Sequence, residues 1–397
     1  MHWIDDDRGL AAVVAEVVGV ERYAIDTEFH REKTYFPQLA LVQLAWADQV
    51  ALIDPLTADP SHLRPLLEGE GLVVMHAADQ DLEVLRHACG AIPRRLFDTQ
   101  VAAGFVGLHS PSLADLVHRV TGERIPKASR LTDWLRRPLT KAQMDYAAAD
   151  VIHLDAVWSE LVRLLEGAGR LDWACDESEQ LRVRRGTPSD PSQAWRRIKE
   201  IRSMRGRAAN VAHRVATWRE TEAARRDEPI RRVMTDMAVV AISQAAPRDL
   251  DAMRQIRGVD GRHLRRGVAE ALLDAVAAGV DDPIVDRPPD RSRQTERRLR
   301  PAVTLVQAWL SQLGRDLRID PALLATRTDV LEFLSGADGA RLATGWRHGL
   351  LAEPVQRLID GDVAVVFRPD GRLALEERSE RPITVDLAVP DAEWLHR

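Results

Sequence analysis

The chain contains little cysteine and no long apolar run. Among its 397 residues there are two cysteines, Cys89 and Cys175, which stand far apart and outside any CxxC pair. Disulfides and a zinc site are therefore not expected. The sequence has no run of eighteen apolar residues and no charged start followed by an apolar segment. We accordingly expect neither a membrane span nor a signal peptide, and a cytoplasmic location.

Signatures of several other chemistries are missing as well. The sequence has no GxxxxGK[ST] loop, no GxSxG elbow and no HExxH helix, and its twelve histidines form no comparable metal-binding pattern. These absences argue against ATP-driven work, serine hydrolase chemistry and zinc hydrolase chemistry. No heptad repeat or long exposed apolar seam is evident either, which favours a monomer.

Carboxylates are what the chain does supply, in three separate patches. Asp26 and Glu28 lie in YAIDTEF, Asp81 lies in HAADQDLEVL, and Tyr146 and Asp150 lie in YAAAD. Carboxylates collected from distant parts of a chain, with no Cys or His cluster beside them, suit hard divalent cations such as Mg²⁺ or Mn²⁺, which prefer oxygen ligands. The combination points to a nuclease.

The spacing within each patch is compatible with one shared site. Tyr23–Phe29 is an apolar run broken only by its acids, which predicts a strand with both acids on one face. Asp81 follows the apolar run Leu72–Met75 and opens an amphipathic stretch, so it is predicted at a helix start beyond a strand end. Tyr146 and Asp150 are four residues apart in an Ala-rich segment, which places them on one helical face.

These side chains match the needs of phosphodiester hydrolysis. Two cations about 4 Å apart, bridged by carboxylates, stabilise both the attacking and the leaving oxygen of an in-line displacement. A nearby tyrosine holds the attacking water by hydrogen bonds. Any single acid is better explained as an exposed strand end, a helix cap or a helix-surface acid. The set together indicates a metal site, because clustered acids are costly unless a cation compensates them.

At this point the motifs resemble a known family. In their order, DTEF, HxxxxD and YxxxD look like the three motifs of the DEDD superfamily of 3′-to-5′ exonucleases, in the subgroup with Tyr in the third motif. The segments IDTEFHREKTYFPQLALVQLA, LFDTQVAAGF, SLADLV and DWLRRPLTKAQMDYAAADV are similar to bacterial ribonuclease D. The resemblance implies a ribonuclease H-like α/β domain. It also implies that Asp26, Glu28, Asp81 and Asp150 bind two divalent cations, Mg²⁺ or Mn²⁺, and that Tyr146 orients the attacking water.

The activity implied by this resemblance is hydrolysis of RNA from its 3′ end with release of 5′-mononucleotides. By family analogy, tRNA 3′ trailers and other small structured RNAs are the expected substrates. Two alternatives stay open. One is a DNA 3′-to-5′ exonuclease, because contacts to the 2′-hydroxyl cannot be recognised in the sequence. The other is an RNA-binding protein whose acidic site is silent, and the complete set of acids argues against it.

Breaks in the hydrophobic pattern divide the chain. RRGTPSDPSQ, residues 184–193, predicts a linker, and residues 281–301 predict a second, exposed connection. We therefore expect an exonuclease domain with a mixed sheet flanked by helices, followed by two small all-α helical bundles. Both bundles resemble HRDC domains, and the sequence DVAVVFRPDGRLALEE predicts a hairpin near the C-terminus. The expected domains are residues 1–188, 195–282 and 295–375, with a tail at 376–397.

Contacts to the substrate are the least specific part of these expectations. The net charge is −6, but Trp195–Arg232 contains twelve basic and five acidic residues, which predicts phosphate contacts. The alternative for this run is a solvated helix face. A histidine that ends a strand and the segment IPKASRLTDWLRRPL add further candidates. For these, packing in the core or pairing with a neighbouring carboxylate is the alternative. The candidate RNA contacts are His76, Lys127, Trp134, Arg137, Arg196, Arg197 and Arg202.

Overall fold

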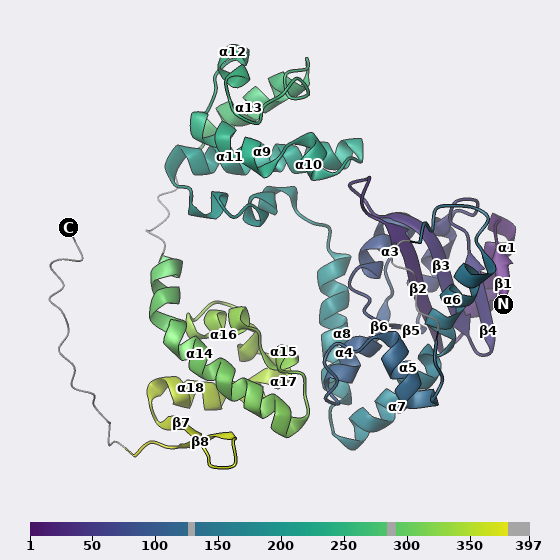
Figure 1. Ribbon diagram of the computed structural model, residues 1–397. Coiled ribbons are helices and arrows are strands. Elements are labelled where there is room, and N and C mark those ends of the chain that lie inside the picture. Colours follow the sequence, from purple (N-terminus) through teal and green to yellow (C-terminus); the bar gives the residue numbers. More distant parts are fainter. Residues whose placement is uncertain (126–131, 284–290, 380–397) are drawn as a thin grey trace. The chain divides into compact units, whose positions relative to one another are not determined.

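The computed structural model describes residues 1–125, 132–283 and 291–379, and Lys127 lies outside them. The chain divides into two compact units, residues 1–290 and residues 291–397. Figure 1 shows the helices and strands of both. In the described part of the chain, no helix has the length and apolar character needed to cross a membrane.

A six-stranded mixed sheet is the frame of the first unit (Figure 1). Its order is β1-β4-β3-β2-β5-β6. The antiparallel meander of β2, β3 and β4 confirms the prediction from the sequence. Strands β1 and β6, which the sequence did not indicate, join the sheet in parallel with β4 and β5. The strands are β1 (His2–Ile4), β2 (Arg22–His30), β3 (Gln38–Trp46), β4 (Gln49–Ile53), β5 (Leu72–Met75) and β6 (Arg95–Asp98).

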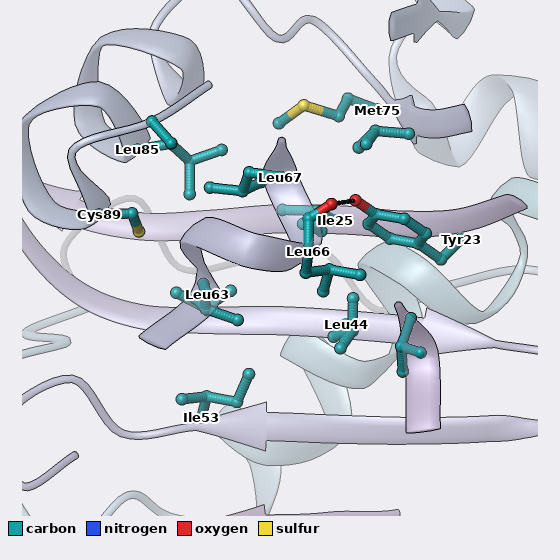
Figure 2. Close-up of a cluster of buried hydrophobic side chains, with 14 of the residues drawn as sticks. Tyr23, Ile25, Leu44, Ile53, Leu63, Leu66, Leu67, Met75, Leu85 and Cys89 are labelled. Carbon is teal, nitrogen blue, oxygen red and sulfur yellow. Dashed lines mark hydrogen bonds between the residues drawn. The ribbon is translucent and has the colours of Figure 1, made fainter. Parts of the chain in front are cut away.

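One face of the sheet carries the larger apolar core, part of which is drawn in Figure 2. Alternate residues of β2 and β3, such as Ile25 and Leu44, point to this face and pack against the covering helices. The buried Tyr23 hydroxyl donates to the carbonyl of Leu66 at 2.8 Å, so the core contains no unsatisfied phenol (Figure 2). The helices that contribute to this core are α1 (Asp7–Val17), α2 (Arg64–Leu67), α3 (Asp81–Cys89) and α8 (Leu171–Gly186).

The opposite face of the sheet is covered mainly by α6, whose small side chains allow close packing. Ala147 and Val151 of this helix contact a second core that includes Ala24 of β2. A reciprocal capping box of Thr140 and Gln143 fixes where α6 begins. The helices on this side and beyond the sheet edge are α4 (Thr99–Gly104), α5 (Leu113–Thr121), α6 (Lys141–Ile152) and α7 (Leu154–Gly167).

The pairing of β2 with β3 is irregular at one place. Glu28 pairs with Leu41 but Phe29 pairs with Leu39, so Ala40 is an extra residue in β3. The carbonyl of Ala40 accepts a hydrogen bond of 2.7 Å from Arg137 Nη2. Such a bulge changes the direction of the side chains next to it. Here the bulge in β3 lies opposite the step from Glu28 to Phe29 in β2.

A helical bundle completes the first unit. Its two longest helices, α9 and α13, approach so closely that a Cβ on Gly279 would lie 2.5 Å from Cα of Val211. The predicted linker starts later than expected, because α8 continues to Gly186 and Pro191–Arg197 forms a 3₁₀ turn. The helices are α9 (Gly206–Arg226), α10 (Ile230–Val233), α11 (Asp236–Ala245), α12 (Leu250–Arg254) and α13 (Val268–Asp281).

The second unit consists of helices and a two-stranded sheet. The hairpin of β7 (Val363–Phe367) and β8 (Leu373–Glu377) confirms the prediction made for this segment. The connection predicted at residues 281–301 is wrong in its second half, because α14 starts at Arg291 and runs through Pro301. The helices are α14 (Arg291–Leu317), α15 (Pro321–Leu324), α16 (Arg327–Leu334), α17 (Gly345–Arg347) and α18 (Glu353–Asp360).

Candidate active site

Two acids of the site come from one strand. Asp26 and Glu28 are two residues apart on β2, so both side chains point to the face that α6 covers. Ala24 precedes them on the same face and belongs to the apolar core there. Thr27, between the two acids, points to the opposite face. The acids therefore interrupt an otherwise apolar surface where the strand approaches its end.

The third acid stands at the start of a helix, as the sequence predicted. Asp81 is the first residue of α3 and is 7% exposed. Its Oδ1 accepts a hydrogen bond of 2.5 Å from the hydroxyl of Thr27, which ties the start of α3 to β2. This contact holds one carboxylate oxygen and leaves the other for a ligand.

Asp98 fixes the loop that leads to Asp81. Its carboxylate accepts from the backbone N–H groups of Ala77 and Ala78, at 3.2 and 2.8 Å. The same carboxylate caps α4 through the N–H groups of Gln100 and Val101. Asp98 is 1% exposed, and these charge-assisted hydrogen bonds compensate its burial. Sequence reasoning gave no role to Asp98 or to Thr27, although LFDTQ and DTEF both belong to the segments that carry the family resemblance.

The last two residues project from one face of α6. Asp150 is 7% exposed and lies among the positions of α6 that face the sheet, between Ala147 and Val151. Tyr146 lies one helical turn before Asp150, and the two side chains affect each other's pKa values. The Tyr146 ring lies 6.0 Å from the ring of Trp134, measured between centroids, which restricts its position.

The electrostatics show that these acids form one cluster. Burial, followed by the charges of Asp81, Asp150 and Glu28, raises the pKa of Asp26 well above its usual range. Burial and the charges of Asp150 and Asp81 raise the pKa of Glu28 to about 8.

The pKa values of the other two carboxyls and of the tyrosine are raised as well. Burial raises the pKa of Asp81 to about 6, against the opposing hydrogen bond from Thr27. Burial raises the pKa of Asp150 to about 7, against the opposing hydrogen bond from Tyr146. Burial, then the charge of Asp150, raises the pKa of Tyr146 above its ordinary value.

The donor set fits divalent cations. No basic side chain is among the causes that shift the pKa values of the four carboxyls, so their mutual repulsion is not offset from within the protein. An oxygen-only set of this kind is what Mg²⁺ and Mn²⁺ prefer. As they stand, no three His, Cys, Asp or Glu side chains of the described residues surround a common point closely enough to hold an ion.

Two further candidates occupy internal positions. Trp134 is 6% exposed and belongs to the core beneath α6. Arg137 forms a two-pronged ion pair with the buried Asp54, at 2.6 and 2.7 Å, and also donates to the carbonyl of Trp134. The arrangement of both residues is the one that sequence reasoning gave as the alternative to substrate contact. Their contacts support α6 and the bulge in β3.

His76 is also held by neighbours. It lies directly after β5, and its Nδ1 is 2.9 Å from the hydroxyl of Thr99. Burial lowers its pKa, against the opposing charge of Asp98. The imidazole is therefore predominantly neutral near pH 7 and is a poor partner for a phosphate.

The arginine-rich run is less available than its composition suggested. Arg219 is 3% exposed and pairs with Asp236 at 2.7 Å, so it is an internal residue. Arg202 Nε donates to the carbonyl of Arg196 at 2.6 Å, and the Arg196 guanidinium lies 5.5 Å from the Trp195 ring centroid. Arg196 and Arg202 are nevertheless exposed, together with Arg197.

Arg197 belongs to a groove between the loop after β2 and the helical bundle. The groove has a volume of about 520 Å³. Two of its arginines have partners, since Arg197 pairs with Glu220 at 2.6 Å and Arg31 pairs with Glu83 at 2.5 Å. The groove is lined by arginines at four positions and by two aromatic rings, namely Arg31, Arg86, Arg197, Arg231, Tyr35 and Phe36.

The two remaining arginines of the groove are uncompensated. Within the described ranges, Arg86 and Arg231 form no ion pair, and Arg86 Nε is buried without a hydrogen-bond partner. The groove walls are joined by hydrogen bonds from Tyr35 to Glu220, at 2.7 Å, and from the Phe36 N–H to Asp227, at 2.9 Å. An anion with a flat, stackable group would complement this surface.

Comparisons with known proteins agree with this geometry. A family model described as 3′-5′ exonuclease matches residues 1–166, and one described as HRDC domain matches residues 208–276. Ribonuclease D of Granulibacter bethesdensis is 36% identical over 370 residues, which cover 91% of this chain and 93% of that protein. Ribonuclease D of Gluconacetobacter diazotrophicus is 38% identical over 363 residues, with coverages of 89% and 88%.

A solved structure is similar over nearly the same length. It is the crystal structure of Escherichia coli RNase D, described as an exoribonuclease involved in structured RNA processing. The two structures superpose with a TM-score of 0.81 at 30% sequence identity. The match covers 90% of this chain and 98% of the other.

Proposed function

Because the chain belongs to the ribonuclease D family and is a 3′-to-5′ exoribonuclease, we propose that Asp26, Glu28, Asp81 and Asp150 together bind two divalent cations, Mg²⁺ or Mn²⁺. The observation that carries this proposal is that β2, α3 and α6 bring four acids into one cluster, with no basic group among the causes that shift their pKa values. Bound cations would supply the positive charge that stabilises the attacking and leaving oxygens of a phosphodiester displacement.

The protein's own residues give that site its geometry. β2 presents Asp26 and Glu28 side by side, while Thr27 and Asp98 fix where Asp81 stands. Asp150 closes the site from α6. The three elements that carry these acids pack in the two apolar cores of the first unit, so the fold itself brings the four acids near one another before substrate arrives.

Tyr146 orients the attacking water. Its hydroxyl lies beside Asp150, and its raised pKa keeps it protonated at neutral pH, so it both donates and accepts hydrogen bonds. A phenol in this state does not act as the base that takes the proton of the water. Its contribution is the alignment of the oxygen with the phosphorus.

The substrate is the 3′ end of an RNA strand, and the products are 5′-mononucleotides. Family analogy favours tRNA precursors and other small structured RNAs, in keeping with the description of the E. coli relative. The groove with Arg86 and Arg231 is the surface that best suits a strand held upstream of its 3′ end. Arg197 also lines this groove, and Arg196 and Arg202 are exposed residues close to it in the sequence.

Matched oligonucleotides of RNA and DNA, labelled at the 5′ end, test the substrate and the polarity. We expect the wild type to shorten the RNA stepwise from its 3′ end with Mg²⁺ or Mn²⁺ and not with EDTA. Asp26→Asn should lower the rate about 10³-fold or more, because it weakens the binding of cations that supply several kcal/mol of transition-state stabilisation.

Asp145→Asn is the control for this experiment. Asp145 is an exposed acid on α6 that pairs with Lys141, and its replacement should leave the rate unchanged. Equal or faster degradation of the DNA would favour the DNA exonuclease alternative. RNA binding without cleavage under every metal condition would favour the silent binding protein, and wild-type cleavage by Asp26→Asn would refute the assigned metal site.

A further inference from the structure

Gln43 is a buried polar residue whose side chain has no partner. It is 0% exposed in the centre of β3, and neither Oε1 nor Nε2 forms a hydrogen bond within the described structure. Burying an amide without hydrogen bonds costs free energy, and a leucine of similar volume would avoid that cost. The position therefore calls for an explanation other than packing in the core.

Its place in the sheet indicates which group the amide serves. Gln43 is directly opposite Asp26 in the antiparallel pair of β2 and β3, so both side chains point to the face covered by α6. Side chains in such a pair have Cβ atoms about 4.5–5.5 Å apart, which is within reach of an amide hydrogen bond.

The other neighbours of Gln43 within the sheet offer it nothing polar. Leu41 and Ala45 flank it on the same face of β3, and Leu52 is its partner in β4. All three belong to the apolar core under α6. Asp26 is therefore the polar side chain that the strand register places beside the amide.

We infer that Gln43 is a positioning residue that acts through Asp26. In the metal-bound protein its Nε2 would donate to the Asp26 carboxylate and so hold that carboxylate in the orientation that binds a cation. This inference rests on the proposed metal site. Carboxylates that bind metals are commonly held in this way by hydrogen bonds from residues behind them.

The chemistry of an amide suits this task better than that of a cationic side chain. A lysine or arginine at the position would neutralise Asp26 and compete with the cation for it. Glutamine donates a hydrogen bond without adding charge, so the negative charge of the cluster remains available to the cations.

Gln43→Leu tests the inference, with Gln43→Met as a second variant of similar volume. Mn²⁺ binding is measured by titration, RNA binding is measured in EDTA, and thermal unfolding is measured in EDTA. We expect the Mn²⁺ dissociation constant to rise about 10- to 100-fold, as is typical when such a supporting hydrogen bond is removed. RNA affinity should be unchanged, and the unfolding temperature of the metal-free protein should be unchanged or higher.

Gln38→Leu is the matched control, because Gln38 starts the same strand and is exposed. It should bind Mn²⁺ as the wild type does. The inference would be overturned if Gln43→Leu and Gln43→Met bound Mn²⁺ with wild-type affinity. It would also be overturned if both variants unfolded at a lower temperature in EDTA, because the amide would then stabilise the fold. Asp150→Asn shows separately whether the proposed metal site exists. If the four acids do not bind the cations, this variant will bind Mn²⁺ as tightly as the wild type.

Discussion

Residues of the candidate active site could be predicted from the sequence where the residue type alone indicates the function. Asp26, Glu28, Asp81 and Asp150 were recognised as acids in strand or helix spacing, and the structure brings their charges into one cluster. Roles that depend on partners distant in sequence were not predictable. Arg137 contacts Asp54, which is 83 positions away, and nothing local to either residue indicates that ion pair.

Tyr146→Phe tests the role of the phenol at this scale. The substitution keeps the ring that packs beside Trp134 and removes only the hydroxyl. We expect kcat to fall about 100-fold, because the attacking water loses its alignment, while Mn²⁺ affinity and RNA affinity stay near wild type. Single-turnover cleavage at saturating metal gives the rate. An unchanged rate would show that the hydroxyl does not orient the nucleophile.

Helices and strands were predicted well where their periodicity is local. β2, β3, β4 and β5, the start of α3 and the helix of Tyr146 all follow from apolar spacing within the chain. β1 and β6 were missed, because three- and four-residue strands contain too few alternations to show a pattern. Their parallel pairing with β4 and β5 is decided by tertiary contacts.

The repulsion between β2, α3 and α6 makes the stability of the metal-free protein depend on pH. Unfolding returns the carboxyls to pKa values near 4, whereas Asp81, Asp150 and Glu28 have folded values of about 6, 7 and 8. Between about pH 4 and 8 the folded protein therefore binds more protons than the unfolded chain, and its free energy of unfolding falls as pH rises.

Mg²⁺ should offset the fall in the free energy of unfolding at higher pH, since it replaces the protons as the charge that compensates the carboxylates. Thermal unfolding with EDTA and with Mg²⁺ checks the prediction at about pH 5.5 and about pH 8, between which the folded carboxyls lose their protons. We expect a larger rise of the unfolding temperature by Mg²⁺ at the higher pH. Asp150→Asn should lose most of that difference, and a rise that is equal at both pH values would contradict the account.

At the scale of the whole molecule, charge composition predicted a basic surface but not its location. The Trp195–Arg232 run contains Arg219, which is internal, and Arg225 and Arg226, which pair with Glu222. The uncompensated charge in the groove comes from Arg231, which belongs to that run, and from Arg86 of α3, which does not. Sequence reasoning missed Arg86 because it stands alone among apolar and acidic residues.

Arg86→Gln combined with Arg231→Gln tests the groove as an RNA surface. We expect weaker binding of long RNA and a salt dependence reduced by about 0.7 per lost phosphate contact. Cleavage of a substrate too short to reach the groove should be unchanged, which separates this surface from the catalytic centre. Arg163→Ala, an exposed arginine of α7 paired with Glu160, serves as the control. Unchanged RNA binding and salt dependence would mean that the groove does not contact RNA.

The central claim is that four carboxylates bind two divalent cations, and counting bound Mn²⁺ tests it most directly. Free Mn²⁺ is measured by electron paramagnetic resonance during titration of the wild type, Asp150→Asn and Asp145→Asn, each with an uncleavable RNA oligonucleotide. We expect the wild type and Asp145→Asn each to bind two Mn²⁺ ions per chain beyond those that the RNA binds by itself. Asp150→Asn should lose this additional binding. Identical Mn²⁺ binding by Asp150→Asn and the wild type would contradict it.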